Sequence, residues 1–326
     1  MGHKIAGPGS AEICLCEAPA SGPILPDMKL TGISDEAGDA LSAQIAAHKE
    51  LGWDTIESRF LQIDDFDKGS IHEIPDEAFD LAATELENAG IKVCGVGSTI
   101  GNWAHSILDP FTVTEGEIER CIVRMQRLDC KIVRIMSYAI LKGDDGSDLP
   151  DQHKEERFRR TRQINKRFAD AGVTAVHENC MNYGGMSIEH ALETLENVPG
   201  LKWVFDTGNP VFAEDRSNPG HRQDAWNFYQ AVKEQIVHVH VKDGVWNTDK
   251  NDMTYTMPGD GDGDVERILR DLNTSGYDGY ISIEPHVAAV FHASDDDGAD
   301  PEEKQKEMFE SYVAYGKRMQ EVVDAL

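Results

Sequence analysis

The sequence lacks any long hydrophobic run. No apolar stretch approaches the roughly 20 residues that a membrane-spanning helix needs, and the first residues do not have the basic and then apolar layout of a signal peptide. The six cysteines are scattered and include no Cys-x-x-Cys pair, which is typical of cysteines that act as small hydrophobic residues in a reducing compartment. We therefore expect a soluble, cytoplasmic protein without a membrane partner.

Basic residues are scarce. The chain has 31 Lys and Arg against 59 Asp and Glu, and its formal net charge is -28. A charge of this sign repels phosphate backbones and anionic lipid headgroups at long range. Nucleic acid is therefore not an expected partner, whereas the acidity by itself identifies no substrate.

Regular patterning is absent from residues 1–27, which are rich in Gly, Pro, Ala and Ser. We interpret them as a short, irregular and flexible N-terminal extension ahead of a single domain, residues 28–326. From Leu30 onward, short apolar runs alternate with amphipathic segments of helix length, and this order repeats eight times. The runs that we expect to form buried parallel strands are 29–34, 55–59, 92–97, 131–136, 174–178, 201–206, 236–242 and 280–284.

Eight βα units in series indicate an α/β protein of the (β/α)8 TIM barrel class. Right-handed crossovers close eight such units most simply into a barrel of about 250 residues. A doubly wound open sheet is the alternative, but that fold favours a glycine-rich phosphate loop after its first strand, and residues 32–36 (Gly-Ile-Ser-Asp-Glu) do not form one. The barrel is the predicted fold.

Four successive predicted strands end in residues of metal-ligand type. Glu178, Asp206 and Glu284 end strands five, six and eight, and His240 lies near the end of strand seven. Functional residues of a barrel lie at the carboxyl ends of its strands, and neighbouring strands bring these ends together. One acidic strand end alone is more often a cap or a surface ion pair, but four in succession favour a shared site.

Three carboxylates and one imidazole predict a divalent-metal site with open positions for substrate oxygens. This oxygen-rich set suits Mn²⁺ first, with Mg²⁺, Co²⁺ or Fe²⁺ as alternatives, better than a closed thiolate zinc site would. His238 shares the inward face of its strand with His240, and we expect it one layer deeper, in a supporting or packing role. The same parity turns His177 toward the helices, where a hydrogen-bonded structural histidine is expected.

Several residues near the strand ends are candidates for contact with the substrate. Lys242 continues the inward-facing set of strand seven and could bind a sugar hydroxyl, neutralise an alkoxide or form a salt bridge at the strand end. Glu57 and Arg59 share a face at the end of strand two, where they could contact a sugar or form an ion pair with each other. Trp103 and Trp246 fall on predicted βα loops, where tryptophan either stacks on a sugar or covers the barrel.

Residues 258–264 (Pro-Gly-Asp-Gly-Asp-Gly-Asp) look at first like a calcium loop. They lack the glutamate at the twelfth position of such a loop and run directly into a predicted helix. We interpret them as a tight βα loop with Asp264 as the N-cap of that helix.

The strings at 177–179, 205–209, 238–243 and 283–286 resemble the sugar isomerase/epimerase family with a xylose isomerase-like barrel. The resemblance extends from about Met28 to the C-terminus and includes residues 32–36, 56–59 and 258–261. It is specific for the superfamily and weak for the substrate. It implies that Glu178, Asp206, His240 and Glu284 hold the metal.

The resemblance further implies that Glu178 and Glu284 exchange protons with carbons beside a sugar carbonyl, through a metal-bound enediolate. The expected protein is a metal-dependent sugar isomerase or epimerase with a small-molecule carbohydrate substrate, acting as a homo-oligomer or with a small partner subunit. A dehydratase or lyase acting on a keto-sugar, keto-inositol or 3-keto-glycoside is the alternative. Abasic-site cleavage of DNA, which relatives of this barrel perform, conflicts with the acidic charge, and a non-catalytic sugar sensor would not need both glutamates.

The substrate contacts depart from the pattern of ketose 3-epimerases of this family. Asn209 takes the place of a histidine three residues after the metal aspartate, and no arginine follows His240 closely. The candidate substrate-binding residues are Lys242, Asn209, Glu57 and Trp246.

Overall fold

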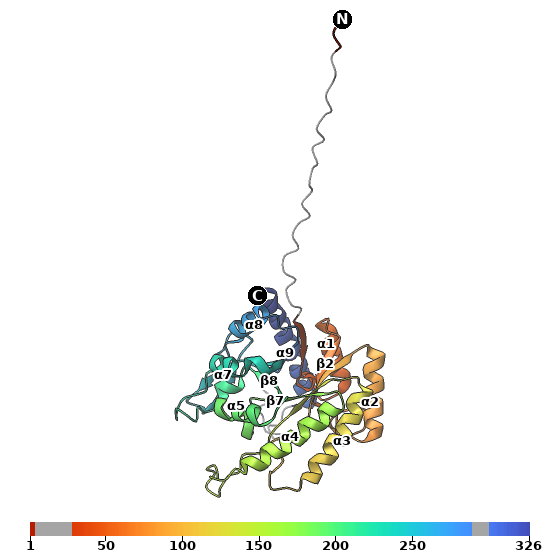
Figure 1. Ribbon diagram of the computed structural model, residues 1–326. Helices are drawn as coiled ribbons and strands as arrows, with labels where there is room; N and C mark the ends of the chain where they lie inside the picture. The colour runs from red at the N-terminus through yellow and green to blue at the C-terminus, as the bar shows by residue number, and fades with distance from the viewer. Residues whose placement is uncertain (4–27, 289–299) are drawn as a thin grey trace.

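The computed structural model describes residues 1–3, 28–288 and 300–326. The expected N-terminal extension therefore lies outside the described residues, apart from its first three. Eight parallel strands form a nearly closed barrel with helices around it (Figure 1). In sheet order these strands are β1 (Lys29–Gly32), β12 (Tyr280–Ile283), β9 (Ile236–Val241), β8 (Lys202–Asp206), β7 (Thr174–Glu178), β6 (Ile132–Ile135), β5 (Lys92–Gly97) and β2 (Thr55–Ser58).

The two end strands of this order, β1 and β2, approach each other through a parallel bridge between Ile33 and Glu57. The predicted (β/α)8 barrel is confirmed, and the open-sheet alternative is wrong. Strands β5 and β7 have the predicted bounds, while the others are one or two residues shorter. Among the described residues, no helix combines the length and the apolar character that crossing a membrane would require.

The helices follow the strands around the barrel. The α-helices are α1 (Leu41–Glu50), α2 (Asp76–Ala89), α3 (Phe111–Arg127), α4 (Lys154–Asp170), α5 (Ile188–Asn197), α6 (Asn209–Phe212), α7 (Ala225–Val232), α8 (Val265–Thr274) and α9 (Pro301–Asp324). The 3-10 turns are η1 (Ser34–Ala37), η2 (Tyr183–Gly185) and η3 (Lys233–Gln235), and two hairpins, β3 (Phe60–Leu61) with β4 (Gly69–Ser70) and β10 (Gly244–Asn247) with β11 (Asp252–Tyr255), extend the loops. Helix α2 ends at Gly90 with φ 70°, the left-handed conformation that glycine reaches at least cost.

The apolar core lies between the strands and the surrounding helices. On β9, Val239 and Val241 belong to this core, whereas His238 and His240 face the barrel interior, where they contact Glu57. Successive side chains along a strand point to opposite faces of the sheet, so the two valines and the two histidines lie on opposite sides of β9. The interior of the barrel at this level is therefore polar and positions the candidate site.

Helix α9 packs closely against the first strand. A Cβ on Gly32 would lie 2.0 Å from the Tyr312 hydroxyl and 2.7 Å from Ile283 Cγ1, so only glycine fits there. The Tyr312 hydroxyl lies 2.8 Å from His48 Nε2, and His48 Nδ1 lies 2.6 Å from the Thr55 carbonyl oxygen. Because a carbonyl can only accept, Nδ1 carries the proton and Nε2 accepts from Tyr312.

Candidate metal centre

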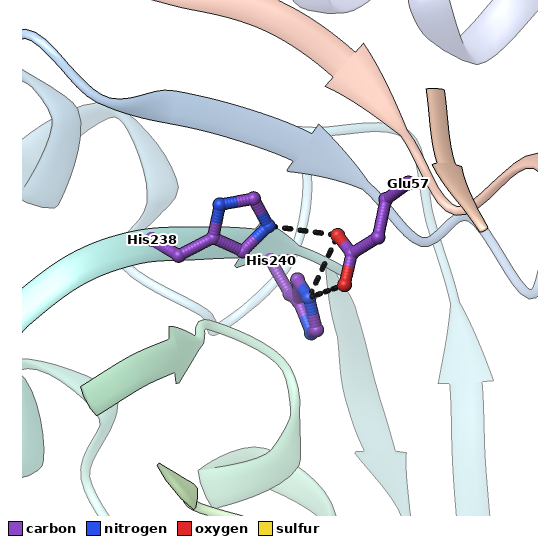
Figure 2. Close-up of side chains that lie close together, drawn as sticks. All are labelled: Glu57, His238 and His240. Carbon is purple, nitrogen blue, oxygen red and sulfur yellow. Dashed lines mark hydrogen bonds and ion pairs between the residues drawn. The ribbon is translucent and has the colours of Figure 1, made fainter. Parts of the chain in front are cut away.

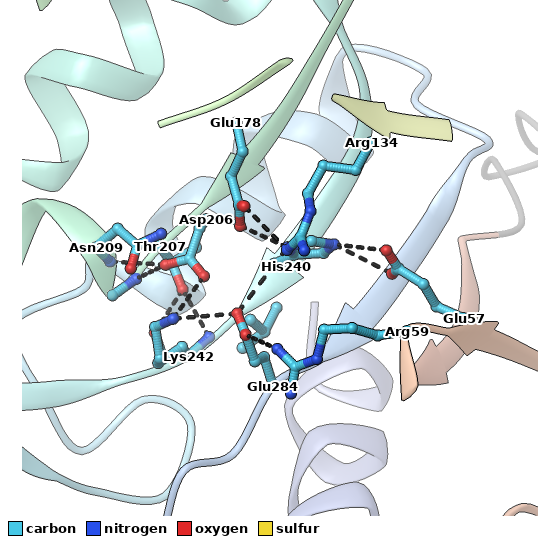
Figure 3. Close-up of polar contacts among 12 residues, drawn as sticks. Glu57, Arg59, Arg134, Glu178, Asp206, Thr207, Asn209, His240, Lys242 and Glu284 are labelled. Carbon is cyan, nitrogen blue, oxygen red and sulfur yellow. Dashed lines mark hydrogen bonds and ion pairs between the residues drawn. The ribbon is translucent and has the colours of Figure 1, made fainter. Parts of the chain in front are cut away.

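Glu178, Asp206, His240 and Glu284 lie together at the carboxyl ends of β7, β8, β9 and β12 (Figure 3). Each offers one ligand atom, and these atoms all lie within 4.8 Å of one another. None of the four residues is more than 4% exposed. The structure thus brings together the set that the strand ends suggested, and its role as a metal site stays a prediction.

Cationic side chains surround the carboxylates. Lys242 Nζ lies 3.0 Å from Glu284 Oε2 and 3.1 Å from Asp206 Oδ2, and Arg134 Nη1 lies 3.1 Å from Glu178 Oε2. These pairs offset much of the cost of burying three acidic groups. Lys242 therefore forms the salt bridge at the strand end that was one of the alternatives for it.

Arg134 was missed by the sequence reasoning. It is buried on β6 between Val133 and Ile135, where an arginine interrupts an apolar run. That interruption was the available signal, because a buried arginine needs a partner. Its partner is Glu178.

Asp206 has the character of a cation ligand. Its Oδ1 accepts from the backbone N–H groups of Gly208 and Asn209 at 2.8 and 2.6 Å. Its Oδ2 is buried and accepts no hydrogen bond from the described residues, since the Lys242 ammonium, although close, is not aligned for one. Burial raises the pKa of Asp206 to about 7. An unsatisfied buried carboxylate oxygen facing two further carboxylates fits a divalent cation.

His240 lies between two glutamates. Its Nδ1 is 2.9 Å from Glu178 Oε1, and its Nε2 is 3.0 and 3.1 Å from the two oxygens of Glu57. Burial disfavours a charged imidazole, but Glu57 and Glu178 outweigh it and raise the pKa of His240 well above its usual value. His240 can therefore hold either a proton or a cation on the side of Glu178.

Glu57 occupies a different place from the one suggested by the sequence. Its carboxylate is 2% exposed and points at His238 and His240, 2.7 Å from His238 Nε2 (Figure 2). Of the two alternatives for Glu57 and Arg59, the mutual ion pair is not formed, because Arg59 pairs with Asp35 at 3.1 Å and Glu284 at 2.8 Å. Glu57 thus lies behind His240 and does not line the cavity described below.

The two other histidines lie as parity predicted. His238 is buried one layer deeper than His240, with its ring centre 5.3 Å from that of His240. His177 is fully buried on the helix side, where its Nε2 is 3.1 Å from Ser137 Oγ and its ring lies against Trp203. His177 is therefore a structural residue.

The glycine-rich loop at 258–264 folds around the carboxylate of Asp243. Oδ1 accepts from the N–H groups of Gly244 and Gly263, and Oδ2 accepts from those of Gly259 and Gly261, at 2.9 to 3.0 Å. Asp264 stands at the N-cap of α8 as predicted, but it makes no side-chain capping bond. The loop is thus a βα connection organised by Asp243, which the sequence reasoning passed over.

A cavity of about 890 Å³ opens beside the ligand set. Asn209 and Trp246, two predicted substrate contacts, line it together with Trp103 and Asn179. The four ligand residues are not among the residues that line it. Asn179 and Asn209 connect the two regions, since both hydrogen-bond to Asp206.

Comparison with known proteins finds similar sequences and similar barrels. The inosose dehydratase of Lacticaseibacillus casei is 26% identical over 161 residues, which cover 43% of this chain and 50% of the relative. The chain thus matches about half the length of this curated relative. Among solved structures, the IOLI protein with a binding zinc atom has a TM-score of 0.63 at 16% identity, covering 91% of this chain and 99% of that one. D-psicose 3-epimerase in the presence of D-fructose has a TM-score of 0.61 at 17% identity, with the same coverage.

The similarity to solved structures at this level of identity shows the fold. The family match spans residues 45–312, from α1 into α9. This range contains all four candidate ligands together with Glu57, Lys242 and Asp243. The chain belongs to the xylose isomerase-like TIM barrel family.

Proposed function

We propose that the protein is a divalent-metal-dependent sugar isomerase or epimerase that removes a proton from the carbon beside a carbonyl group and returns a proton either to that carbon or to the carbonyl carbon. The observation that supports this most is the placement of two glutamates around one candidate metal centre. Glu178 and Glu284 end β7 and β12, which are separated in the sheet by the strands of Asp206 and His240. Two carboxylates are thereby available on either side of one small site.

The proposed ligands are Glu178, Asp206, His240 and Glu284, with Mn²⁺ as the first choice and Mg²⁺, Co²⁺ or Fe²⁺ as alternatives. The bound ion would supply the positive charge that stabilises negative charge developing on the oxygens of the substrate. The zinc atom in the IOLI structure makes Zn²⁺ a further ion to test.

Both glutamates are ionised at neutral pH, which is the protonation state that a base requires. Burial opposes ionisation, but Lys242, His286 and Arg59 hold the pKa of Glu284 well below its usual value. Arg134 and His240 likewise lower the pKa of Glu178. One carboxylate removes the proton from carbon, and either the same or the opposite one returns a proton, which yields isomerisation or epimerisation respectively.

A dehydratase is the second candidate, and the ammonium group of Lys242 favours it. This cation lies 3.0 Å from Glu284, so an acid and a base stand side by side. A glutamate would take the proton from the carbon beside the carbonyl, Lys242 would protonate the leaving hydroxyl, and water would depart as the carbon–carbon double bond forms. Inosose dehydratase is the activity of the curated relative.

One experiment separates these candidates. The protein, loaded in turn with each divalent ion, is incubated in deuterated water with free ketoses, a keto-inositol and a keto-glycoside, and the products are followed by NMR and mass spectrometry. Isomerisation or epimerisation replaces a carbon-bound hydrogen by deuterium without loss of any other atom, whereas dehydration removes the mass of one water. Glu178→Gln and Glu284→Gln should each lower exchange by roughly 100-fold or more.

Glu117→Gln is the matched control, because Glu117 is also buried beside a histidine, 3.3 Å from His105, on helix α3 away from the site. It should retain full exchange. If the wild type neither takes up a divalent ion nor exchanges a proton with any substrate of the panel, the proposed function is wrong.

A further inference from the structure

The cavity beside the ligand set is larger than a simple sugar requires. Its volume is about 890 Å³. A hexose occupies roughly 200 Å³ if it is counted as six or seven water-sized units of about 30 Å³ each. Pockets that bury drug-sized ligands measure about 300–1,000 Å³. The cavity therefore has room for a substituent larger than the sugar ring.

Two parts of the cavity wall carry large apolar and aromatic side chains, which the ligand set lacks. Trp103 and Met181 line it and are each 57% exposed. On the other wall, Phe212 and Trp246 meet edge to face with ring centres 6.1 Å apart, and the Arg222 guanidinium lies 3.4 Å from the centre of the Trp246 ring. Arg222 also donates to the Phe212 carbonyl at 2.9 Å, which fixes this wall.

Charged side chains of both signs also line the cavity. Lys142 and Arg216 both form ion pairs with Asp148. The shared carboxylate offsets one of these two positive charges and reduces the attraction that the pair would exert on a second anion. The exposed aromatic rings suit a flat, apolar group.

We propose that the substrate is a sugar or cyclitol joined to such a group, with its polyol part at the ligand set and its aromatic part against Trp246. This inference rests on the proposed function, because it places the polyol at the candidate metal centre. Asn209 lies at the junction, where it lines the cavity and donates its backbone N–H to Asp206.

The test compares phenyl β-D-glucoside with methyl β-D-glucoside by calorimetric titration of the Mn²⁺-loaded protein. The phenyl compound should bind at least about tenfold more tightly, because burying a ring of this size gains more than burying a methyl group. Trp246→Ala should abolish the difference, and Met181→Ala should reduce it. Leu81→Ala, at an exposed leucine outside the cavity, should leave it intact.

Equal affinities for the two glucosides, or a preference for phenyl that survives in both cavity variants, would overturn the inference. Proton exchange with free ketoses is scored separately. Proton exchange without a phenyl preference would support the proposed function and contradict the inference about the aromatic group. A phenyl preference without proton exchange would support the inference and contradict the proposed function.

Glu57 carries an independent inference about the candidate ligand His240. A carboxylate can only accept, so the two imidazole nitrogens that face it, Nε2 of His238 and Nε2 of His240, both carry hydrogen (Figure 2). The other nitrogen of His240, Nδ1, lies 2.9 Å from Glu178 Oε1 and donates to that carboxylate when no ion is bound, so its hydrogen is the one that a cation on this side would replace. Nδ1 is therefore the atom by which His240 can bind a cation.

The same contacts fix the plane of the ring. Both oxygens of Glu57 lie within 3.1 Å of His240 Nε2, and the second imidazole holds the carboxylate in place at 2.7 Å. A carboxylate behind a histidine ligand orients the ring and raises the basicity of the ligating nitrogen. We propose that Glu57 is a positioning residue for the metal ligand His240, and neither a substrate contact nor a ligand itself.

Calorimetric titration of the metal-free protein with Mn²⁺ tests this role. Glu57→Gln should weaken binding roughly 10- to 100-fold at an unchanged stoichiometry of one ion, whereas Glu117→Gln should not change it. A fall from two bound ions to one in Glu57→Gln would mean that Glu57 is a ligand, and an unchanged affinity would mean that its position is irrelevant; either result overturns the proposal. Should the variant fail to fold, ¹⁵N NMR of wild-type His240 decides, since hydrogen absent from Nε2 contradicts the arrangement.

Discussion

The Lys242 ammonium group lies 3.0 Å from Glu284 Oε2, inside the ring of candidate metal ligands. It also lies 3.1 Å from Asp206 Oδ2, so one cationic side chain attracts two carboxylates that are also candidate ligands of a divalent ion. Lys242 and the ion therefore stabilise the same buried charges.

Lys242→Met should destabilise the metal-free protein by about 3–5 kcal/mol, because removing one partner of a buried ion pair leaves the other charge uncompensated. Addition of Mn²⁺ should then raise the melting temperature of the variant more than that of the wild type. Thermal unfolding with and without Mn²⁺ measures both effects. Lys142→Met, which removes an exposed ion pair with Asp148, is the control, and equal Mn²⁺-induced shifts in Lys242→Met and the wild type would contradict the shared role.

Gly32→Ala should destabilise the fold by at least about 1–3 kcal/mol, because its methyl group would lie 2.0 Å from the Tyr312 hydroxyl and displace α9 from β1. The same substitution at Gly116, inside α3, meets Arg120 Nη1 at 3.4 Å. Gly116→Ala should instead stabilise by about 0.5–1 kcal/mol, because alanine favours helix. Urea denaturation of the two variants should give changes of opposite sign, and a neutral Gly32→Ala would refute the close packing.

His48 should make the free energy of unfolding depend on pH in the acidic range. Burial lowers the pKa of His48 from 6.5 to about 4, so the folded protein keeps this imidazole neutral. The stabilising contribution of the neutral form is complete above pH 6.5 and is lost as the pH falls toward 4, by up to about 3 kcal/mol.

His48→Gln removes that titration while retaining groups that can bond to Thr55 and Tyr312. Free energies of unfolding, measured between pH 7.5 and pH 4 in the same buffer, should fall less steeply for His48→Gln than for the wild type. His221→Gln, at an exposed histidine, should follow the wild-type slope. Parallel curves for all three proteins would exclude His48 as the source.

Asp243→Asn should loosen the loop at 258–264. The amide nitrogen cannot accept, so two of the four backbone N–H groups that now bond to Asp243 would lose their acceptor. Proteolytic cleavage within the loop should become faster without global unfolding. Asp260→Asn, at an exposed side chain of the same loop, should leave the cleavage rate unchanged.

Strand order and strand ends could be predicted from the sequence because each buried parallel strand is a short apolar run with one polar end. Glu178 and Asp206 are the last residues of their strands, and Glu284 directly follows β12. Contacts between distant strands could not be predicted in this way. The pairing of Glu57 with β9 spans 181 residues to His238, and it depends on barrel closure and on an irregular register between Ile56 and Glu57 that no local pattern reveals.

The loop around Asp243 has a consequence for how this sequence can vary. A Cβ at Gly261 or Gly263 would lie 2.3 or 2.8 Å from Asp243 Oδ1, so neither position admits a side chain while the aspartate is present. Asp260 and Asp262, in contrast, point to solvent. In homologous proteins that retain Asp243, both glycines should therefore be retained as well, while the two acidic residues at 260 and 262 should vary and offer sites for a label or a charge change.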